Sequence, residues 1–436
     1  MKVFKFGGAS VNSADAVRNM AQIVQSHLGS EPLIVVVSAM GKTTNMLENL
    51  VPGSSVSRQQ QAALRRQLED CHRGIAASLM PDSVAVQQKI DSLLATLDHL
   101  SASLPGTVES YNYNYDQIVS IGELLSTTII AEYLNHIGTN TLWVDARQII
   151  LTDNHYREGR VDWQATGDCA ARLWETVTRE ASACQVIVTQ GFIAGVAQQA
   201  DRSPLSTTTL GREGSDYSAA ILAYCLGAES VTIWKDVPGF LNADPKYFRN
   251  TVKISQIPYN EAIELAYYGA SVIHPKTVKP IQNKKIPLYI RSFITPEAEG
   301  SSIGDYRALV PETPLYIFKN NQILLSILPR DYSFIAEDNL QVIFGILSRI
   351  GIRVNLMQNS ALSFSICMDN NRQLVDVLTN ELKSMFHVRY NDNLQLITIR
   401  YYTQEIIDSI VAGRMVLLEQ RSRTTEQIIV PVNCKP

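Results

Sequence analysis

Residues 207–217 read TTTLGREGSDY and place a glycine-rich turn between a β-prone run and a helix-prone run. The two glycines permit a tight turn, and the start of a helix presents unpaired N–H groups and a partial positive charge, which suits an anion such as phosphate. Arg212 can bind a carboxylate or phosphate through two hydrogen bonds, and Asp216 can hold a metal-bound phosphate. Taken alone, the stretch is better explained as a helix that Ser215 caps after a glycine turn.

Strands, small-residue turns and helices alternate on both sides of this stretch. Strands are predicted at 2–6, 33–37, 141–144, 185–189, 230–234 and 286–290, and helices at 14–28, 163–181, 218–223 and 259–268. The run LIVVV at 33–37 is apolar throughout, which is typical of a parallel strand covered on both faces. The alternation predicts an α/β fold with a parallel sheet, and ligands of such sheets bind at the carboxyl ends of the strands.

Residues 55–136 lack strand patterns and predict a helical insertion, with helices at 58–77, 83–99 and 116–134. The alternating sequence YNYNY at 111–115 is interpreted as a loop or a short edge segment. Glu123 lies between apolar residues of the third helix, and taken alone it is interpreted as a surface charge. His274, which precedes a proline, is interpreted as a packed or capping residue rather than a catalytic one.

The pattern changes in the last third of the chain. Residues 296–314 are rich in proline, glycine, serine and charge, and they predict a linker. A β-α-β-β-α order over 315–386 fits a small ferredoxin-like (βαββαβ) module. Residues 387–436 predict a shortened second copy, made of segments at 393–401, 404–411, 414–418 and 427–432. Such a pair of modules favours regulation or assembly over chemistry.

Composition excludes several classes of protein. The chain has 436 residues, 45% of them hydrophobic, and a net charge of -4, so two or three domains with large cores are expected. Neither nucleic acid nor a membrane is an expected partner, because there is no basic excess and every apolar run is far shorter than a membrane span. The six scattered cysteines predict reduced, mostly buried thiols, and the strand at 2–6 leaves no room for a signal peptide. A cytoplasmic location is expected.

Six motifs in order along the chain resemble those of the aspartate kinases, which belong to the amino-acid kinase family. They are KFGGASV at 5–11, SIGE at 120–123, TQGFI at 189–193, the stretch 207–217, DVPG at 236–239 with DP at 244–245, and 269–275. The resemblance implies an αβα sandwich kinase domain over 1–295. It also implies MgATP-dependent phosphorylation of the β-carboxylate of L-aspartate, the entry step to lysine, threonine, methionine and isoleucine synthesis. The two modules resemble paired ACT domains, which implies a homodimer joined through residues from about 315 onward and an amino-acid effector.

The resemblance also implies roles for individual residues. Lys5 and Asp216 are implied to be catalytic, with magnesium carried by ATP near Asp216 and no direct protein ligand. The implied aspartate pocket consists of Ser38, Thr44, Glu123, Phe192, Arg212 and Ser215. The implied nucleotide site consists of Lys5, Gly7, Gly8, Ser10, Gly211, Lys235, Asp236, Leu241 and Lys246, with Lys253 as a further candidate. Arg212 suits a substrate carboxylate and Glu123 a substrate ammonium. A general base is scarcely needed, because the carboxylate acceptor is already ionised at neutral pH.

The sequence departs from the aspartate kinase pattern at several positions. Ala9 replaces a usual threonine, Glu213 a usual glycine, Leu241 a frequent tyrosine and Lys246 a frequent arginine. Asn355 stands where lysine-sensitive members carry an aspartate, so lysine control does not transfer from the resemblance. Two alternatives stay open: an amino-acid kinase for another acid, such as glutamate or acetylglutamate, and a catalytically silent amino-acid sensor.

Overall fold

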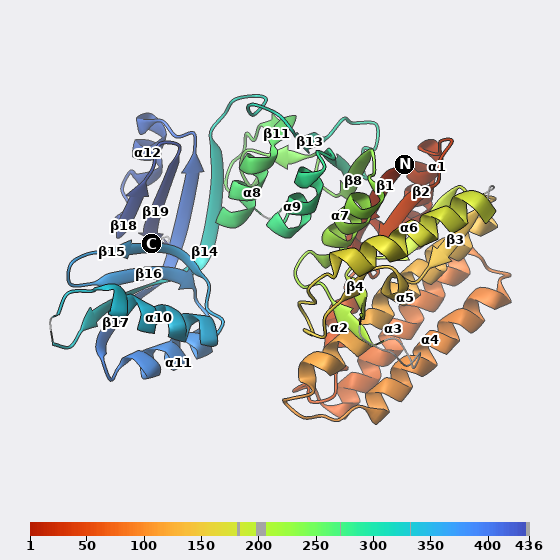
Figure 1. Cartoon of the computed structure of the whole chain (residues 1–436), viewed down its shortest axis with the longest axis horizontal. Helices are drawn as coiled ribbons and strands as arrows, with labels where there is room; N and C mark the ends of the chain where they lie inside the picture. The colour runs from red at the N-terminus through yellow and green to blue at the C-terminus, as the bar shows by residue number, and fades with distance from the viewer. Residues whose placement is uncertain (181–183, 198–205, 271, 332, 433–436) are drawn as a thin grey trace. The chain divides into compact units, whose positions relative to one another are not determined.

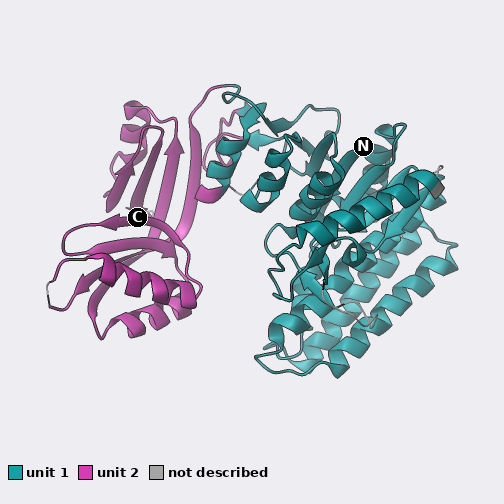
Figure 2. Cartoon of the chain, in the orientation of Figure 1, with its two compact units in different colours: residues 1–240, 253–266, 271–311 teal, residues 241–252, 267–270, 312–436 magenta. Residues whose placement is uncertain are grey.

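The structure is a computed structural model that describes residues 1–180, 184–197, 206–270, 272–331 and 333–432 (Figure 1). The chain divides into two compact units (Figure 2). Unit 1 comprises residues 1–240, 253–266 and 271–311, and unit 2 comprises residues 241–252, 267–270 and 312–436. No helix among the described residues is both long enough and apolar enough to cross a membrane.

Unit 1 is built on an eight-stranded sheet in the order β11-β13-β12-β8-β1-β2-β5-β3. The strands are β1 (Lys2–Phe6), β2 (Leu33–Val37), β3 (Thr141–Val144), β5 (Val186–Gln190), β8 (Ser230–Lys235), β11 (Gln256–Pro258), β12 (Leu288–Ser292) and β13 (Ser301–Gly304). All neighbouring pairs are parallel except β12 and β13. The predicted all-apolar strand β2 lies between β1 and β5 and is buried along its whole length, as its sequence indicates.

Helices cover both faces of this sheet, which confirms the αβα sandwich. On one face, α1 (Ala14–Ser26), α3 (Arg58–Leu79), α4 (Val84–Ser103) and α5 (Tyr111–His136) share an apolar core with side chains of β1, β2 and β5. On the other, α7 (Gly214–Leu226) packs on β1, β2 and β8, beside α6 (Trp163–Glu180) and α9 (Pro275–Asn283). The remaining elements of unit 1 are smaller. They are η1 (Gly8–Val11), α2 (Thr43–Glu48), η2 (Ala146–Gln148), β4 (Leu151–Thr152), β6 (Ile193–Val196), β7 (Thr207–Thr209), β10 (Lys253–Ile254) and most of α8 (Tyr259–Tyr268), while β9 (Phe240–Leu241) ends the first segment.

Three predictions about local structure in unit 1 can be compared directly with the fold. The sequence YNYNY is the first part of α5 rather than a loop, because Tyr115 is buried and the buried Asn114 amide donates to the carbonyl of Pro105 at 2.6 Å. The predicted linker 296–314 contains β13, whose four residues are all buried and pair with β11 and β12. His274 is the N-cap of α9, where its Nδ1 accepts from the backbone N–H of Lys276.

Unit 2 contains one six-stranded antiparallel sheet in the order β15-β16-β14-β17-β19-β18. Its elements are β14 (Leu315–Pro329), α10 (Glu337–Arg349), β15 (Val354–Asn359), β16 (Phe364–Asp369), α11 (Arg372–Leu382), β17 (Phe386–Arg400), α12 (Gln404–Val411), β18 (Leu418–Arg421) and β19 (Thr425–Pro431). The predicted β-α-β-β-α order is confirmed. The long strands β14 and β17 pair along both halves of the sheet, so the two modules are continuous with each other. Of the predicted segment at 414–418, only Leu418 belongs to a strand, since the pairing of β18 with β19 starts at Leu418 and Ile429.

The five cysteines that the structure describes are free, as predicted, but they are less buried than expected. Cys367 is buried, whereas Cys71, Cys169, Cys184 and Cys225 are half-buried. Cys434 lies outside the described residues.

Candidate active site

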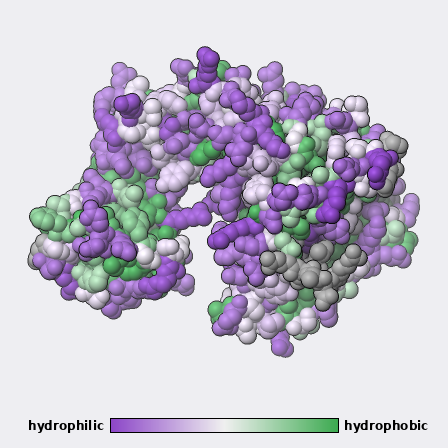
Figure 3. All heavy atoms as spheres, in the orientation of Figure 1, coloured by the Kyte–Doolittle hydropathy of each residue, from purple (hydrophilic) through white to green (hydrophobic). Residues whose placement is uncertain are grey.

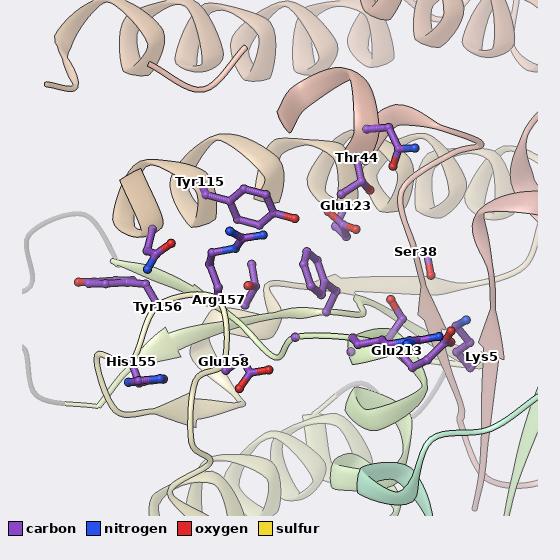
Figure 4. A pocket seen from close by; sticks show the side chains of 18 residues that line it. Lys5, Ser38, Thr44, Tyr115, Glu123, His155, Tyr156, Arg157, Glu158 and Glu213 are labelled. Carbon is purple, nitrogen blue, oxygen red and sulfur yellow. The ribbon is translucent and has the colours of Figure 1, made fainter. Parts of the chain in front are cut away.

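A cavity of about 840 Å³ opens in unit 1 beside the carboxyl end of β1 and the start of α7 (Figure 4). Eight of the residues named from the sequence line it: Lys5, Ser38, Thr44, Glu123, Phe192, Gly211, Arg212 and Ser215. Its other lining residues are Asn45, Asn112, Tyr115, His155, Tyr156, Arg157, Glu158, Thr209, Glu213 and Gly214. The whole predicted aspartate pocket therefore surrounds one cavity.

Two lysines converge on a buried carboxylate at this edge of the sheet. Lys5 Nζ lies 2.6 Å from Asp216 Oδ1, and Lys235 Nζ lies 3.4 Å from Asp216 Oδ2. Lys5 and Lys235 come from the neighbouring strands β1 and β8, and Asp216 stands in the first turn of α7, where the helix favours negative charge. Burial opposes ionisation of Asp216, but the two ammonium groups hold the pKa of its carboxyl below the usual value.

Glu123 is buried in the middle of α5, so the interpretation as a surface charge is wrong. Its Oε1 accepts weakly from the backbone N–H of Ala39 at 3.4 Å, and its Oε2 has no hydrogen-bond partner among the described residues. Burial raises the pKa of Glu123 to about 8. A Cβ on the preceding Gly122 would lie 3.1 Å from the side chain of Ala39. Glycine at position 122 therefore permits α5 to approach the turn after β2 closely, and this approach brings Glu123 to that turn. The site therefore contains a carboxyl that a bound cation would stabilise.

The turn at 210–214 has a different cap from the one predicted. The N-cap of α7 is Glu213, in a left-handed conformation (φ 54°) with no side-chain capping bond, and Ser215 lies inside the helix. The hydroxyl of Ser215 therefore does not cap the helix as predicted. It faces Gly191, where any side chain is excluded because a Cβ would lie 2.7 Å from Ser215 Oγ.

The glycine turn after β1 packs tightly against the turn after β2. A Cβ on Gly8 would lie 2.7 Å from the carbonyl oxygen of Ala39, so only glycine fits. Gly7 lies beside Lys5, and Ser10 donates its hydroxyl to the carbonyl of Gly7 at 2.6 Å.

The other residues of the predicted nucleotide site have different placements. Asp236 is exposed directly after β8, and Lys253 is exposed on β10. Leu241 and Lys246 belong to unit 2 and are not among the residues that line the cavity.

Sequence reasoning missed the loop at 153–160 and the residue that holds it. Asp116 is buried on α5. Its Oδ2 accepts from the backbone N–H groups of Arg157 at 2.8 Å and of Thr209 at 3.0 Å. Its Oδ1 accepts from the Thr209 hydroxyl at 2.7 Å. Burial, partly opposed by these donors, raises the pKa of Asp116 to about 6. The one nearby sequence signal is the YNYNY alternation, which ends directly before Asp116.

The fold and this lysine–carboxylate arrangement define a class of phosphotransferase, and comparison with known proteins gives the class its name. The chain matches the amino acid kinase family over residues 1–292 and belongs to that family. Within it, the chain is an aspartokinase. It is 31% identical over 413 residues to the lysine-sensitive aspartokinase 3 of Escherichia coli, and this alignment covers 91% of this chain and 86% of that protein.

Solved structures agree with this placement. A crystal structure of E. coli aspartokinase III in complex with aspartate and ADP (R-state) superposes with a TM-score of 0.84 at 27% identity, covering 99% of this chain and 96% of the other. The structure of E. coli aspartokinase III with lysine and aspartate (T-state) gives a TM-score of 0.79 at 28% identity, with the same coverage.

Proposed function

We propose that the chain transfers the γ-phosphate of ATP to the β-carboxylate of L-aspartate and so forms 4-phospho-L-aspartate, the entry compound of lysine, threonine, methionine and isoleucine synthesis. The observation that carries the proposal is one cavity lined by both Lys5, which pairs with Asp216, and Glu123, a buried carboxyl whose Oε2 has no hydrogen-bond partner among the described residues. The first group suits a transferring phosphate and the second suits a substrate ammonium. The complex of a relative with aspartate and ADP supports the same assignment.

The phosphate side of the reaction needs positive charge and little covalent help. An oxygen of the β-carboxylate attacks the γ-phosphorus, the new O–P bond forms, and the bond to the bridging oxygen of ADP breaks. Lys5 and Lys235 stabilise the charge that develops on the phosphoryl oxygens, because both are fixed before the substrates arrive. Asp216 acts as the carboxylate that orients the two ammonium groups. The acceptor is already ionised at neutral pH, so no general base is required.

The residues of the proposed aspartate pocket explain why a free amino acid is the substrate. Glu123 receives the ammonium, and an ion pair in a buried position strongly favours the ionised carboxylate over the protonated form. Arg212 is a bidentate partner for a substrate carboxylate, while Ser38, Thr44, Phe192 and Ser215 complete the lining. An N-acylated acid has no ammonium, so it would leave the Glu123 carboxyl without its partner. This argues against acetylglutamate as the substrate.

MgATP is the co-substrate, and the residues present fit magnesium that arrives with the nucleotide. Among the described residues there is no group of three or more His, Cys, Asp or Glu side chains that could hold a metal ion. Magnesium commonly binds through substrate phosphates and one or two carboxylates, and Asp216 is the carboxylate we assign nearby. Within unit 1 the nucleotide site would comprise Lys5, Gly7, Gly8, Ser10, Gly211, Lys235 and Asp236, as expected from the sequence.

Unit 2 would serve assembly and control. The strand β15 forms an open edge of the six-stranded sheet, and open edges are seldom left unpaired. Exposed apolar side chains lie around this edge, and Figure 3 shows hydrophobic surface over this part of unit 2. They include Phe334, Met357 and Leu362. A homodimer joined through these residues, with an amino-acid effector at the interface, fits these observations, and we keep the cytoplasm as the expected location.

A trapping experiment tests the reaction. An acyl phosphate reacts with hydroxylamine to give a hydroxamate, whereas ATP hydrolysis gives none. Aspartate-dependent hydroxamate formed in step with ADP is the expected result. ADP release without hydroxamate would instead show an ATPase, and the proposal would then be wrong.

A further inference from the structure

The strand β7 is an edge strand that leads directly into the glycine turn. It lies at the end of the three-stranded order β4-β6-β7, and its three residues are all buried. Alternate residues of a strand direct their backbone groups to opposite edges. On the β6 side, the Leu210 N–H donates to the Phe192 carbonyl at 2.9 Å. The backbone groups of Thr207 and Thr209 therefore face away from β6, and because they are buried they need other partners.

Two consecutive side chains of α5 take the place of a neighbouring strand. Gln117 binds the backbone of Thr207 twice, because its Oε1 accepts from the N–H at 3.1 Å and its Nε2 donates to the carbonyl at 2.8 Å. Asp116 also binds Thr209 twice, through the N–H at 3.0 Å and the hydroxyl at 2.7 Å. Both side chains are buried. We refer to Asp116 and Gln117 as the β7 clamp, since they hold this strand at both of its ends.

The carboxylate of Asp116 also fixes the loop that packs against the glycine turn. It accepts from the Arg157 N–H at 2.8 Å, and the Gly159 N–H donates to the Thr209 carbonyl at 2.9 Å. Arg157 is held at φ 69°, a left-handed conformation that arginine rarely adopts. A Cβ on Gly211 would lie 3.3 Å from the carbonyl oxygen of Arg157, so the loop lies directly against the turn. Asp116 thus holds the turn from two sides, through β7 and through this loop.

On the basis of the proposed aspartate kinase function, we propose that Asp116 and Gln117 are positioning residues of the aspartate site, which hold the glycine turn at a fixed distance from Glu123. Asp116 and Glu123 lie on the same helix, about 10 Å apart along its axis. The turn carries Arg212, which is assigned to a substrate carboxylate, and Glu123 is assigned to the substrate ammonium. One helix therefore sets the spacing between the two groups that would bind opposite charges of the amino acid.

A positioning role differs from a contribution to stability alone. A substrate that is bound at two points tolerates little error in their spacing, since a misplacement of about 1 Å can cost about 10²-fold in rate. Loss of the β7 clamp should therefore weaken aspartate binding in particular. ATP should be affected much less, because Lys5 and Lys235 lie on β1 and β8 of the main sheet, which the clamp does not contact.

Steady-state kinetics of variants in the β7 clamp test the positioning role. Asp116→Leu removes every hydrogen bond of the carboxylate and should raise the aspartate KM by about tenfold or more, with the ATP KM within about threefold of wild type. Gln117→Met keeps the length of the side chain but loses both bonds to Thr207, and it should act in the same direction. Asp116→Asn is the conservative variant. Its amide can accept from both N–H groups and donate to the Thr209 hydroxyl oxygen, so its aspartate KM should stay within about threefold of wild type.

The other end of α5 offers a matched control. Asn135 Oδ1 accepts from the Thr141 N–H at 2.8 Å, and its Nδ2 donates to the Thr141 carbonyl at 2.9 Å. These are the same two bonds that Gln117 makes to Thr207, but Asn135 is not among the described residues that line the cavity. Asn135→Leu should therefore lower the melting temperature and leave both KM values as in wild type.

Amide hydrogen exchange measures the β7 clamp without turnover. The N–H groups of Thr207 and Thr209 donate to the clamp side chains, so their exchange reports whether these bonds are made. Peptides that cover residues 207–214 should exchange at least about tenfold faster in Asp116→Leu and Gln117→Met than in wild type. In Asp116→Asn and Asn135→Leu the exchange of this segment should match wild type.

The outcomes that would overturn the proposal are specific. They are a wild-type aspartate KM in folded Asp116→Leu or Gln117→Met, an equal rise in the ATP KM, or an equal rise of the aspartate KM in Asn135→Leu. Where Asp116→Leu does not fold, Gln117→Met and Thr209→Val, which loses only the hydroxyl bond, decide in its place. A wild-type enzyme that does not phosphorylate aspartate would instead refute the proposed function, whereas unchanged exchange over 207–214 in folded Gln117→Met would refute the clamp, so the two failures are distinct.

Discussion

The ammonium of Lys5 lies 2.6 Å from the carboxylate of Asp216, and both side chains are almost completely buried. Lys235 approaches the other oxygen of the same carboxylate at 3.4 Å. Two cations share one anion, so the cluster carries an excess positive charge at the end of the sheet where substrate phosphates would lie. The excess charge is fixed by the fold before substrate binds, which is the condition for efficient electrostatic catalysis.

Lys5→Ala should lower the turnover of aspartate by about 10²-fold or more, the scale for losing a positioned charge at a transition state. The variant should still fold, because Lys235 remains as a partner of Asp216. Steady-state kinetics with circular dichroism as a folding check measure this. The matched control is Lys2→Ala, since Lys2 lies on the same strand but is exposed. Near-wild-type turnover in folded Lys5→Ala would remove Lys5 from the reaction.

Glu123→Gln should raise the aspartate KM and leave the ATP KM nearly unchanged. The reason is that the amide keeps the shape of the side chain but loses the charge that would pair with the substrate ammonium. Initial rates with each substrate varied in turn give both constants. An equal weakening of both substrates would instead assign Glu123 a structural role.

The same variant should be more stable than the wild-type enzyme near neutral pH. Burial raises the pKa of the Glu123 carboxyl in the folded protein to about 8, from its ordinary value of 4.5. The folded protein therefore prefers the protonated carboxyl. Below about pH 4.5 the carboxyl is protonated in both the folded and the unfolded chain, and it costs no stability. As the pH rises toward 8 the unfolded chain ionises first, so the free energy of unfolding falls. Glutamine has no such loss, so at pH 7 the variant should gain up to about 3 kcal/mol in the free energy of unfolding. Melting curves from pH 5 to 8 would show a smaller pH dependence in Glu123→Gln, and parallel curves would contradict the assigned burial.

Lysine should inhibit this enzyme weakly or not at all. Asn355 has no charge, and its side chain is fully engaged: Oδ1 accepts from Lys319 Nζ at 2.9 Å, and Nδ2 donates to Gln322 and Asp369. An effector ammonium would have to displace Lys319. Asn355→Asp adds the missing charge and should bind lysine about tenfold more tightly. Titration of lysine, threonine and methionine against activity and melting temperature tests this, and inhibition of the wild-type enzyme by micromolar lysine would refute it.

The sequence predicted those parts of the fold and site that depend on local pattern. The apolar run at 33–37 and the glycine turns placed the sheet and its functional edge, because a buried parallel strand and a tight turn each demand particular residue types. Read alone, Glu123 is interpreted as a surface charge, because its partner Ala39 lies 84 positions away in the turn after β2 and no local pattern reports that contact. The role of Asp116 depends on contacts with residues 41 and 93 positions away, and no local pattern reports such contacts.

The sequence also does not indicate that the two C-terminal modules share one continuous sheet. Each half of β14 reads as an ordinary strand, and only its pairing with β17 over both halves shows that the modules share one sheet. The prediction that Ser215 caps α7 was wrong for a different reason. The local signal was present, but the helix is capped by Glu213 in a left-handed conformation, so it starts two positions earlier than a Ser215 cap would place it.

The most direct test is ADP production with MgATP and a panel of L-aspartate, L-glutamate and N-acetyl-L-aspartate, measured as kcat/KM in a coupled assay. Aspartate should be preferred by at least about 10²-fold, because glutamate displaces the acceptor carboxylate and the acetylated acid leaves Glu123 unpaired. Comparable values for glutamate or for the acetylated acid, or no aspartate-dependent rate above the ATP background, would contradict it.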